Sequence, residues 1–69
     1  MTMRHYDSSQ DRTFNCAVLY INAGGRRKQA TVKTIAPAAD LAMALAERIV
    51  RADNRRRVQS VYYTSAIEQ

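Results

Sequence analysis

Few of the side chains that commonly carry out chemistry occur in this sequence, and they are scattered along it. His5 is the single histidine and lies in a polar stretch, where we expect it to be solvated. Cys16 is the single cysteine and falls within a strand-like run rather than at an activating helix N-terminus, so we expect a packed, inert thiol. No cysteine–histidine group has the spacing of a metal site, so neither a metal nor another cofactor is expected.

Serine, acidic and glycine residues offer no catalytic arrangement either. No pair of carboxylates is spaced for acid–base work, and Gly24-Gly25 lacks the rest of a phosphate-loop pattern. The serines have neither a nucleophile elbow nor the context of a triad; they are Ser8, Ser9, Ser60 and Ser65. We therefore predict that the protein is not an enzyme.

Basic residues are the one group whose number and spacing suggest a function. Eleven lysines and arginines against six acidic residues give a net charge of +5 and a pI near 10.0. Such a balance favours binding to polyanions or to acidic surfaces of other proteins, although it also serves solubility alone. Six of the basic residues form two runs, Arg26-Arg27-Lys28 and Arg55-Arg56-Arg57.

The length of 69 residues allows one domain with a small core. An internal disulfide is excluded, so a homodimer stays open as a source of extra stability. The longest apolar run, residues 16–21, is too short to cross a bilayer, so no membrane association is expected. Residues 1–12 carry both charge signs and are expected to form a mobile tail before a single domain over 13–69. The lone thiol fits a cytoplasmic protein.

The elements that position the basic residues follow from the pattern of apolar residues. Two β-forming runs, 13–23 and 29–35, flank Gly24-Gly25, which predicts a hairpin. Pro37 opens an amphipathic helix over 37–52, which Asn54 is expected to end in a left-handed conformation. A third strand is expected over about 56–64. The predicted apolar face of the helix consists of Ala38, Leu41, Ala42, Leu45, Ala46, Ile49 and Ala52.

This β-β-α-β order predicts an α+β fold in which a three-stranded antiparallel sheet of order 2-1-3 carries the helix on one face. The hairpin turn, the C-terminal end of the helix and the start of the third strand then meet at one pole. Eight basic residues are expected there: Arg26, Arg27, Lys28, Arg48, Arg51, Arg55, Arg56 and Arg57. The alternative is that loop ends are simply where charge is easily placed.

One helix covers only one face of such a sheet. The other face is expected to present a set such as Phe14, Tyr20 and Tyr62. This open face would serve as a homodimer or protein interface, or as a platform on which nucleic-acid bases stack.

About half of the chain follows a simple layout of Ala30-Thr31-Val32-Lys33, the alanine-rich helix over 37–52 and the strand over 58–63. This layout resembles that of many tiny phage and mobile-element proteins, including some anti-CRISPR inhibitors of type I surveillance complexes. It implies a compact protein that blocks a larger nucleoprotein machine. Such inhibitors are often acidic DNA mimics, whereas this chain is basic.

Three functions remain in view. The first is a non-catalytic inhibitor, encoded by a phage or mobile element, that binds a host nucleoprotein complex through the basic pole. The second is a direct, sequence-independent nucleic-acid-binding protein. The third is a self-associating structural or assembly subunit in which the charge is incidental.

Overall fold

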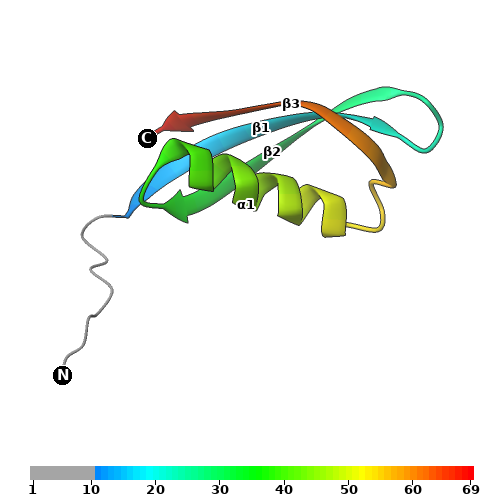
Figure 1. The fold of residues 1–69 in the computed structure, drawn as a ribbon. Coiled ribbons are helices and arrows are strands. Elements are labelled where there is room, and N and C mark those ends of the chain that lie inside the picture. Colours follow the sequence, from blue (N-terminus) through cyan, green and yellow to red (C-terminus); the bar gives the residue numbers. More distant parts are fainter. Residues whose placement is uncertain (1–10) are drawn as a thin grey trace.

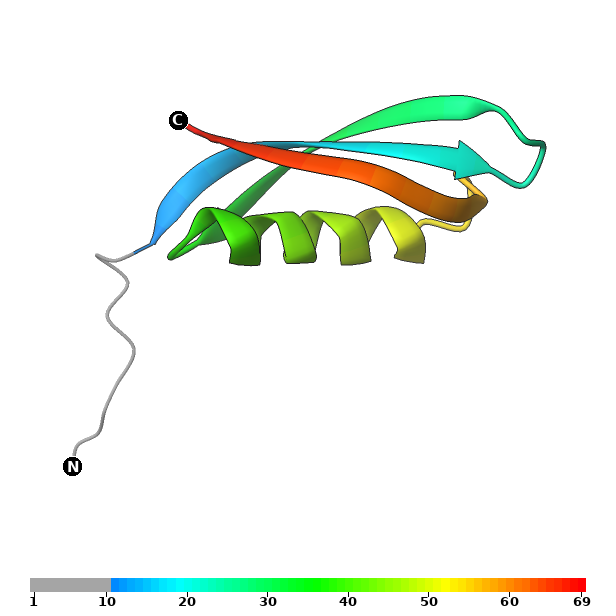
Figure 2. The ribbon, with the colours of Figure 1, turned by 45° about the horizontal axis from the view of Figure 1, so that its top comes forward.

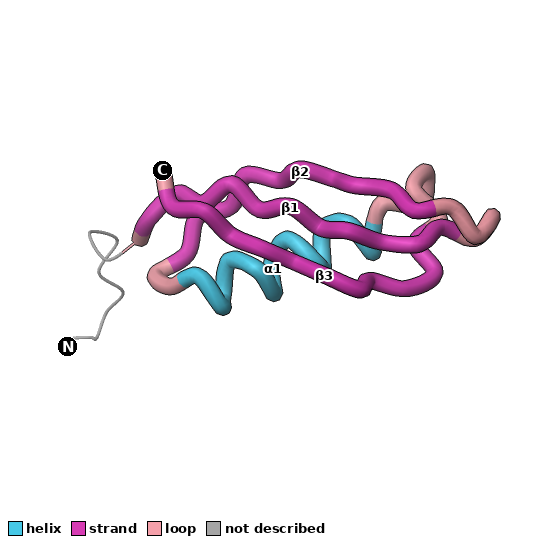
Figure 3. Tube along the Cα trace, turned by 90° about the horizontal axis from the view of Figure 1, so that it is seen from above, coloured by secondary structure: helices cyan, strands magenta, loops and turns pink. Residues whose placement is uncertain are grey.

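The computed structural model describes residues 11–69, which form three strands and one helix in the order β-β-α-β (Figure 1). They are β1 (Arg12–Asn22), β2 (Arg27–Ala36), α1 (Ala39–Ala52) and β3 (Val58–Glu68). The sheet order is β2-β1-β3, and both strand pairs are antiparallel (Figure 3). The predicted α+β fold, with its strand order and connectivity, is therefore confirmed.

The expected N-terminal tail, residues 1–12, lies outside the described residues except for its last two. Arg12 already belongs to β1, where it is the register partner of Ala36. Its Nη1 atom also lies 3.6 Å from the Glu68 Oε1 atom of β3. The ordered strand therefore begins one residue earlier than the sequence suggests.

Strand β1 lies in the centre of the sheet because it is apolar on both faces. Alternate residues point to opposite faces of a strand. The set that points to the helix is fully buried and consists of Phe14, Cys16, Val18 and Tyr20. The other set is half-buried on the open face, which no described element covers (Figure 2), and includes Ala17, Leu19 and Ile21.

Helix α1 packs on the sheet through a narrow stripe of small residues, Ala42, Ala46 and Val50. Leu41, Leu45 and Ile49, which the sequence places in the same face, are exposed on one flank of the helix, and Ala38 and Ala52 are exposed as well. That part of the predicted face is wrong. Small side chains allow the helix to approach the sheet closely, and the larger ones are left outside the contact.

The rotation of the helix is held by a polar contact on its opposite flank. Thr64 of β3 donates a hydrogen bond of 3.2 Å from Oγ1 to the Glu47 Oε2 atom. Glu47 also forms an i,i+4 ion pair with Arg51, with 3.7 Å between Oε1 and Nε. The carboxylate therefore ties the last turns of the helix to β3.

The hairpin turn depends on a glycine and an asparagine. Gly25 adopts a φ of 78°, a left-handed conformation in which a side chain would be strained. The side chain of Asn22 accepts hydrogen bonds from the backbone N–H groups of Gly24 and Arg26, at 2.9 and 3.0 Å. The predicted hairpin is confirmed. Strand β1 starts and ends one residue earlier than expected, and β2 is longer than expected at both ends.

The chain leaves α1 differently from the prediction. The helix ends at Asp53 in an extended conformation with φ of −81°, and Asn54 is not left-handed. The left-handed residue is instead Arg57, with φ of 52°, directly before β3. Strand β3 consequently begins at Val58 rather than at residue 56, and it extends to Glu68 because it follows β1 along its whole length.

Which face of α1 packs on the sheet can be tested by making the same Ala→Leu substitution at a buried site and at an exposed site. Replacing buried Ala46 with Leu overpacks the contact with the sheet, and we expect it to lower the free energy of unfolding by about 1 to 3 kcal/mol. Replacing exposed Ala44 with Leu should change it by no more than about 0.5 kcal/mol. Urea denaturation of both variants checks this. Equal losses would place the buried stripe elsewhere on the helix.

Candidate basic binding groove

The hairpin turn and the loop between α1 and β3 lie side by side at one end of the molecule (Figures 1 and 2). The backbone N–H of Ala23 donates a hydrogen bond of 2.8 Å to the carbonyl oxygen of Arg57. This bond joins the segment that carries Arg26-Arg27-Lys28 to the segment that carries Arg55-Arg56-Arg57. The strand order thus brings together two basic runs that are far apart in the sequence.

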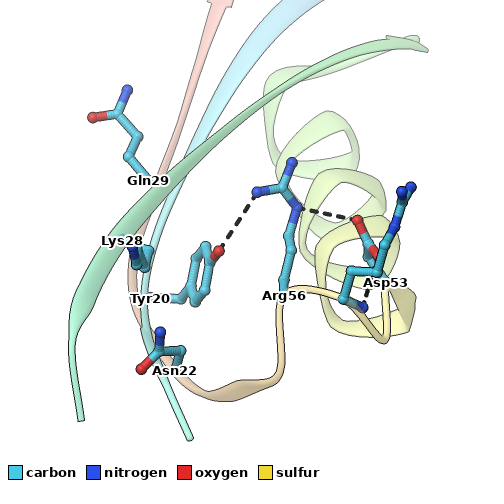
Figure 4. A pocket seen from close by; sticks show the side chains of 7 residues that line it. Tyr20, Asn22, Lys28, Gln29, Asp53 and Arg56 are labelled. Atoms are coloured by element: carbon cyan, nitrogen blue, oxygen red, sulfur yellow. Dashed lines mark hydrogen bonds and ion pairs between the residues drawn. The ribbon is translucent and has the colours of Figure 1, made fainter. Parts of the chain in front are cut away.

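A groove of about 580 Å³ opens between these segments, and we call it the basic groove. It begins where α1 ends, so residues of the helix-facing side of β1 and β2 reach the surface there (Figure 4). Its cations are Lys28, Arg55 and Arg56, and its other lining residues are Tyr20, Asn22, Gln29 and Asp53.

Arg56 lies between two partners that fix its guanidinium group (Figure 4). Its Nη1 atom donates a long hydrogen bond of 3.5 Å to the Tyr20 hydroxyl, and its Nε atom lies 3.3 Å from the Asp53 Oδ2 atom. The pKa of Arg56 is raised, chiefly by the hydrogen bond to Tyr20, while burial acts in the opposite direction and the Asp53 carboxylate adds a smaller increase. Arg56 therefore stays charged at every physiological pH.

Asp53 organises the loop that carries the arginines. Its backbone oxygen accepts a hydrogen bond from the Arg56 N–H at 3.0 Å, and its Oδ1 atom accepts one from the Arg55 N–H at 3.1 Å. The Arg55 guanidinium lies 3.8 Å from the same carboxylate but is 95% exposed. Exposed ion pairs of this kind contribute at most about 1 kcal/mol, so Arg55 is available to another anion.

The other predicted cations do not line the basic groove. Arg26, Arg27 and Arg57 are exposed in the two adjoining segments. Arg51 pairs with Glu47 on the helix. Arg48 lies on the other flank of α1, in a shallow hollow with Leu45, Ile49 and Ala52. The eight basic residues expected at one pole therefore fall into three groups. Three line the basic groove, three lie in the segments next to it, and two lie on the helix outside it.

The expected open-face set is wrong for two of its three residues. Phe14 and Tyr20 are buried on the helix side, with Tyr20 only 3% exposed. Cys16 lies close under the alanine stripe, its Sγ atom 3.6 Å from the Ala42 carbonyl oxygen, so this set of β1 residues faces the helix. Tyr62 is exposed, but it lies beside a register shift of β3 in a hollow shared with Met43. The large exposed residues of the open face are instead Tyr63, Ile67 and Ile35.

The groove residues that sequence reasoning missed are polar or aromatic side chains next to the cations. Tyr20 was expected on the open face, and Asp53 was not among the expected binding residues. The usable signal for Asp53 was its position directly after the helix, where a carboxylate accepts hydrogen bonds from the following N–H groups. Nothing in the sequence marks Asn22 and Gln29 as groove residues.

The side chains first considered for chemistry do not gather at this groove. His5, Ser8 and Ser9 lie outside the described residues. Cys16 is completely buried as predicted, with its Sγ atom 3.4 Å from the Thr34 Oγ1 atom. Within residues 11–69, no three histidine, cysteine or acidic side chains are grouped so that they could hold a metal ion. Over the same range, no helix has the length and apolar character needed to span a membrane.

Known proteins give no direct guide to this surface. The sequence matches no protein-family model, and no curated protein or solved structure matches the chain. The resemblance in layout to small phage and mobile-element proteins stays a prediction. The basic groove is interpreted from its own geometry and charge.

Two substitutions at Arg57 can separate the effect of its charge on binding from the effect of its left-handed backbone conformation on stability. Replacement with Gly removes the charge and relieves a backbone conformation that costs other residues about 1 to 2 kcal/mol. Replacement with Ala removes the charge but keeps that cost. After the extra chain entropy of Gly is subtracted, we expect Arg57→Gly to be about 0.5 to 1 kcal/mol more stable than Arg57→Ala.

Thermal and urea unfolding of the two variants measure this difference, and titration with a polyanion should show the same loss of affinity for both. A Gly variant less stable than the Ala variant would contradict the left-handed conformation at this position.

Proposed function

We propose that the chain is a non-catalytic nucleic-acid-binding protein whose basic groove contacts the phosphate backbone without reading base sequence. The observation that carries this proposal is the convergence of Lys28, Arg55 and Arg56 on one groove, with Arg56 held in place by Tyr20 and Asp53. Cations directed at phosphates supply most of the sequence-independent affinity for nucleic acids.

The chemistry of the groove favours phosphate over an acidic protein surface. Protein interfaces gain most of their energy from buried aromatic and apolar anchors. Among residues 11–69, Tyr20 is the one aromatic residue that lines this groove, and its hydroxyl already accepts a hydrogen bond from Arg56. The large exposed apolar residues lie elsewhere, on the flank of α1, along β3 and at the end of β2. Hydrogen-bond donors and charge are what the groove offers.

The architecture also favours backbone contacts over base reading. A helix that reads bases presents polar side chains to the major groove of DNA. The exposed flank of α1 carries Leu41, Leu45 and Ile49 beside Arg48, so it does not present a continuous polar face. The cations are at the start of β2 and in the loop before β3, positions that suit contacts with phosphates along a strand.

The test is fluorescence anisotropy with labelled single-stranded and duplex DNA and RNA at several salt concentrations. We expect log affinity to fall linearly with log salt. Arg55→Ala and Arg56→Ala should each flatten the slope on duplex DNA by about 0.9, because each removes one phosphate contact. Arg12→Ala is the matched control, since it removes the same charge at the opposite end of the sheet and should leave the slope unchanged.

Two results would overturn the proposal. Equal changes of slope for Arg12→Ala and Arg55→Ala would show that only net charge matters. An absence of binding even at low salt would indicate that the groove binds an acidic protein and not nucleic acid. That outcome would favour the inhibitor of a host nucleoprotein complex that the layout implies, and pull-downs against such complexes would follow.

A further inference from the structure

The outer edge of β2 is a surface that the proposed function does not use. Strand β2 has one neighbour, β1, and among residues 11–69 nothing pairs with its other edge. Its ten residues keep a continuous register with β1, whereas the register of β3 is shifted at two points. A long, regular edge presents unpaired backbone N–H and C=O groups to any strand that can add to it.

An apolar stripe runs along the helix on the same side of the molecule. Leu41, Leu45 and Ile49 follow one another at intervals of four residues and are 49%, 38% and 51% exposed. The opposite flank of α1 faces β3, where Glu47 accepts the hydrogen bond from Thr64. The stripe is therefore on the β2 side, below the free edge of the sheet.

We propose that this side binds a second copy of the chain, with two β2 strands paired antiparallel about a two-fold axis. The pair would form a continuous six-stranded sheet, twice the three strands of one copy. With both helices on the same face, the two stripes would lie against each other. A two-fold interface uses the same patch on both copies, so each apolar stripe meets its own equivalent.

The free edge of β2 and the apolar stripe of α1 are placed so that a single two-fold axis can pair each of them with its equivalent in the second copy. Leu45, the middle of the stripe, lies about 9 Å along the helix from Ala39. Strand β2 covers that distance in about three residues back from Ala36, which brings the axis near its middle, at Val32 to Thr34. The centres of the strand contact and of the helix contact therefore lie at about the same height.

The charges of β2 also permit this pairing. With the axis at Val32, Lys28 lies opposite Ala36 and Lys33 opposite Thr31; with the axis at Thr34, Lys33 lies opposite Ile35. Neither of these two registers sets like charges directly against each other. An axis at Lys33 would place the two Lys33 residues opposite each other and is disfavoured, because like charges directly opposite are destabilising. Because the hairpin turn is at the start of β2, antiparallel copies place their basic grooves at opposite ends of the sheet. The groove cations of the two copies are thus kept apart.

The size of this side agrees with a stable dimer. An edge of ten residues is about 33 Å long, and the molecule measures 23 and 16 Å along its shorter axes. The area of this side is then roughly 600 Å² per copy. Two copies together would bury about 1,200 Å², which is the lower end of the range for specific interfaces.

The oligomeric state is measured without nucleic acid, by sedimentation equilibrium across a range of protein concentrations, so the result does not depend on the proposed function. We expect a dimer whose dissociation constant rises at least about 100-fold in the variant Leu45→Glu/Ile49→Glu, because four carboxylates would enter the contact. Tyr63→Glu, on the open face, is the matched control and should leave the dimer intact. Circular dichroism confirms that each variant is folded.

Hydrogen exchange locates the contact independently of any variant. The outward-pointing amides of β2 should exchange more slowly as protein concentration rises, whereas those at the outer edge of β3 should not change. A monomer at millimolar concentration would overturn the proposal. So would a dimer that is disrupted by Tyr63→Glu but not by Leu45→Glu/Ile49→Glu, since that result would place the contact on the open face.

Discussion

The close contact between the small residues of α1 and the central strand is the constraint on which the rest of the structure depends. Ala42 and Ala46 allow the helix to lie directly over Cys16 and Val18. A chain this short has room for one such contact, and the larger apolar residues of the helix remain on its flank. The same contact ends at Val50, so the final part of the sheet is left uncovered, and there the side chain of Tyr20 reaches the basic groove.

The order and type of the elements were predictable because each carries a strong local signal. Gly24-Gly25 between two β-forming runs indicated the hairpin, and the period of the alanine-rich segment indicated the helix. The rotation of the helix was not predictable in the same way. Its leucines dominate the apolar pattern, yet burial is decided by which side chains permit close approach and by the Glu47–Thr64 hydrogen bond, a contact between distant residues. The ends of β3 depend likewise on pairing with β1.

The site shows the same division between local and long-range information. Topology alone brought the two basic runs to one end of the sheet, because antiparallel strands and a returning helix leave no other arrangement. The groove itself depends on the face to which Tyr20 points and on how Asp53 folds the loop, and both follow from packing. Charge in this molecule is thus concentrated at one end, whereas its exposed apolar area lies along the sides.

The two ends of the described chain meet at the opposite end of the sheet. The backbone N–H of Gln69 donates a hydrogen bond of 2.9 Å to the carbonyl oxygen of Thr13. A fluorophore, a fusion partner or a tether to a sensor surface joined after Gln69 would therefore sit at the far end of β1 from the basic groove. Immobilised in this way, the protein presents its charged end to solution, and a circular permutant of residues 11–69 that reopens the chain elsewhere needs only a short linker here.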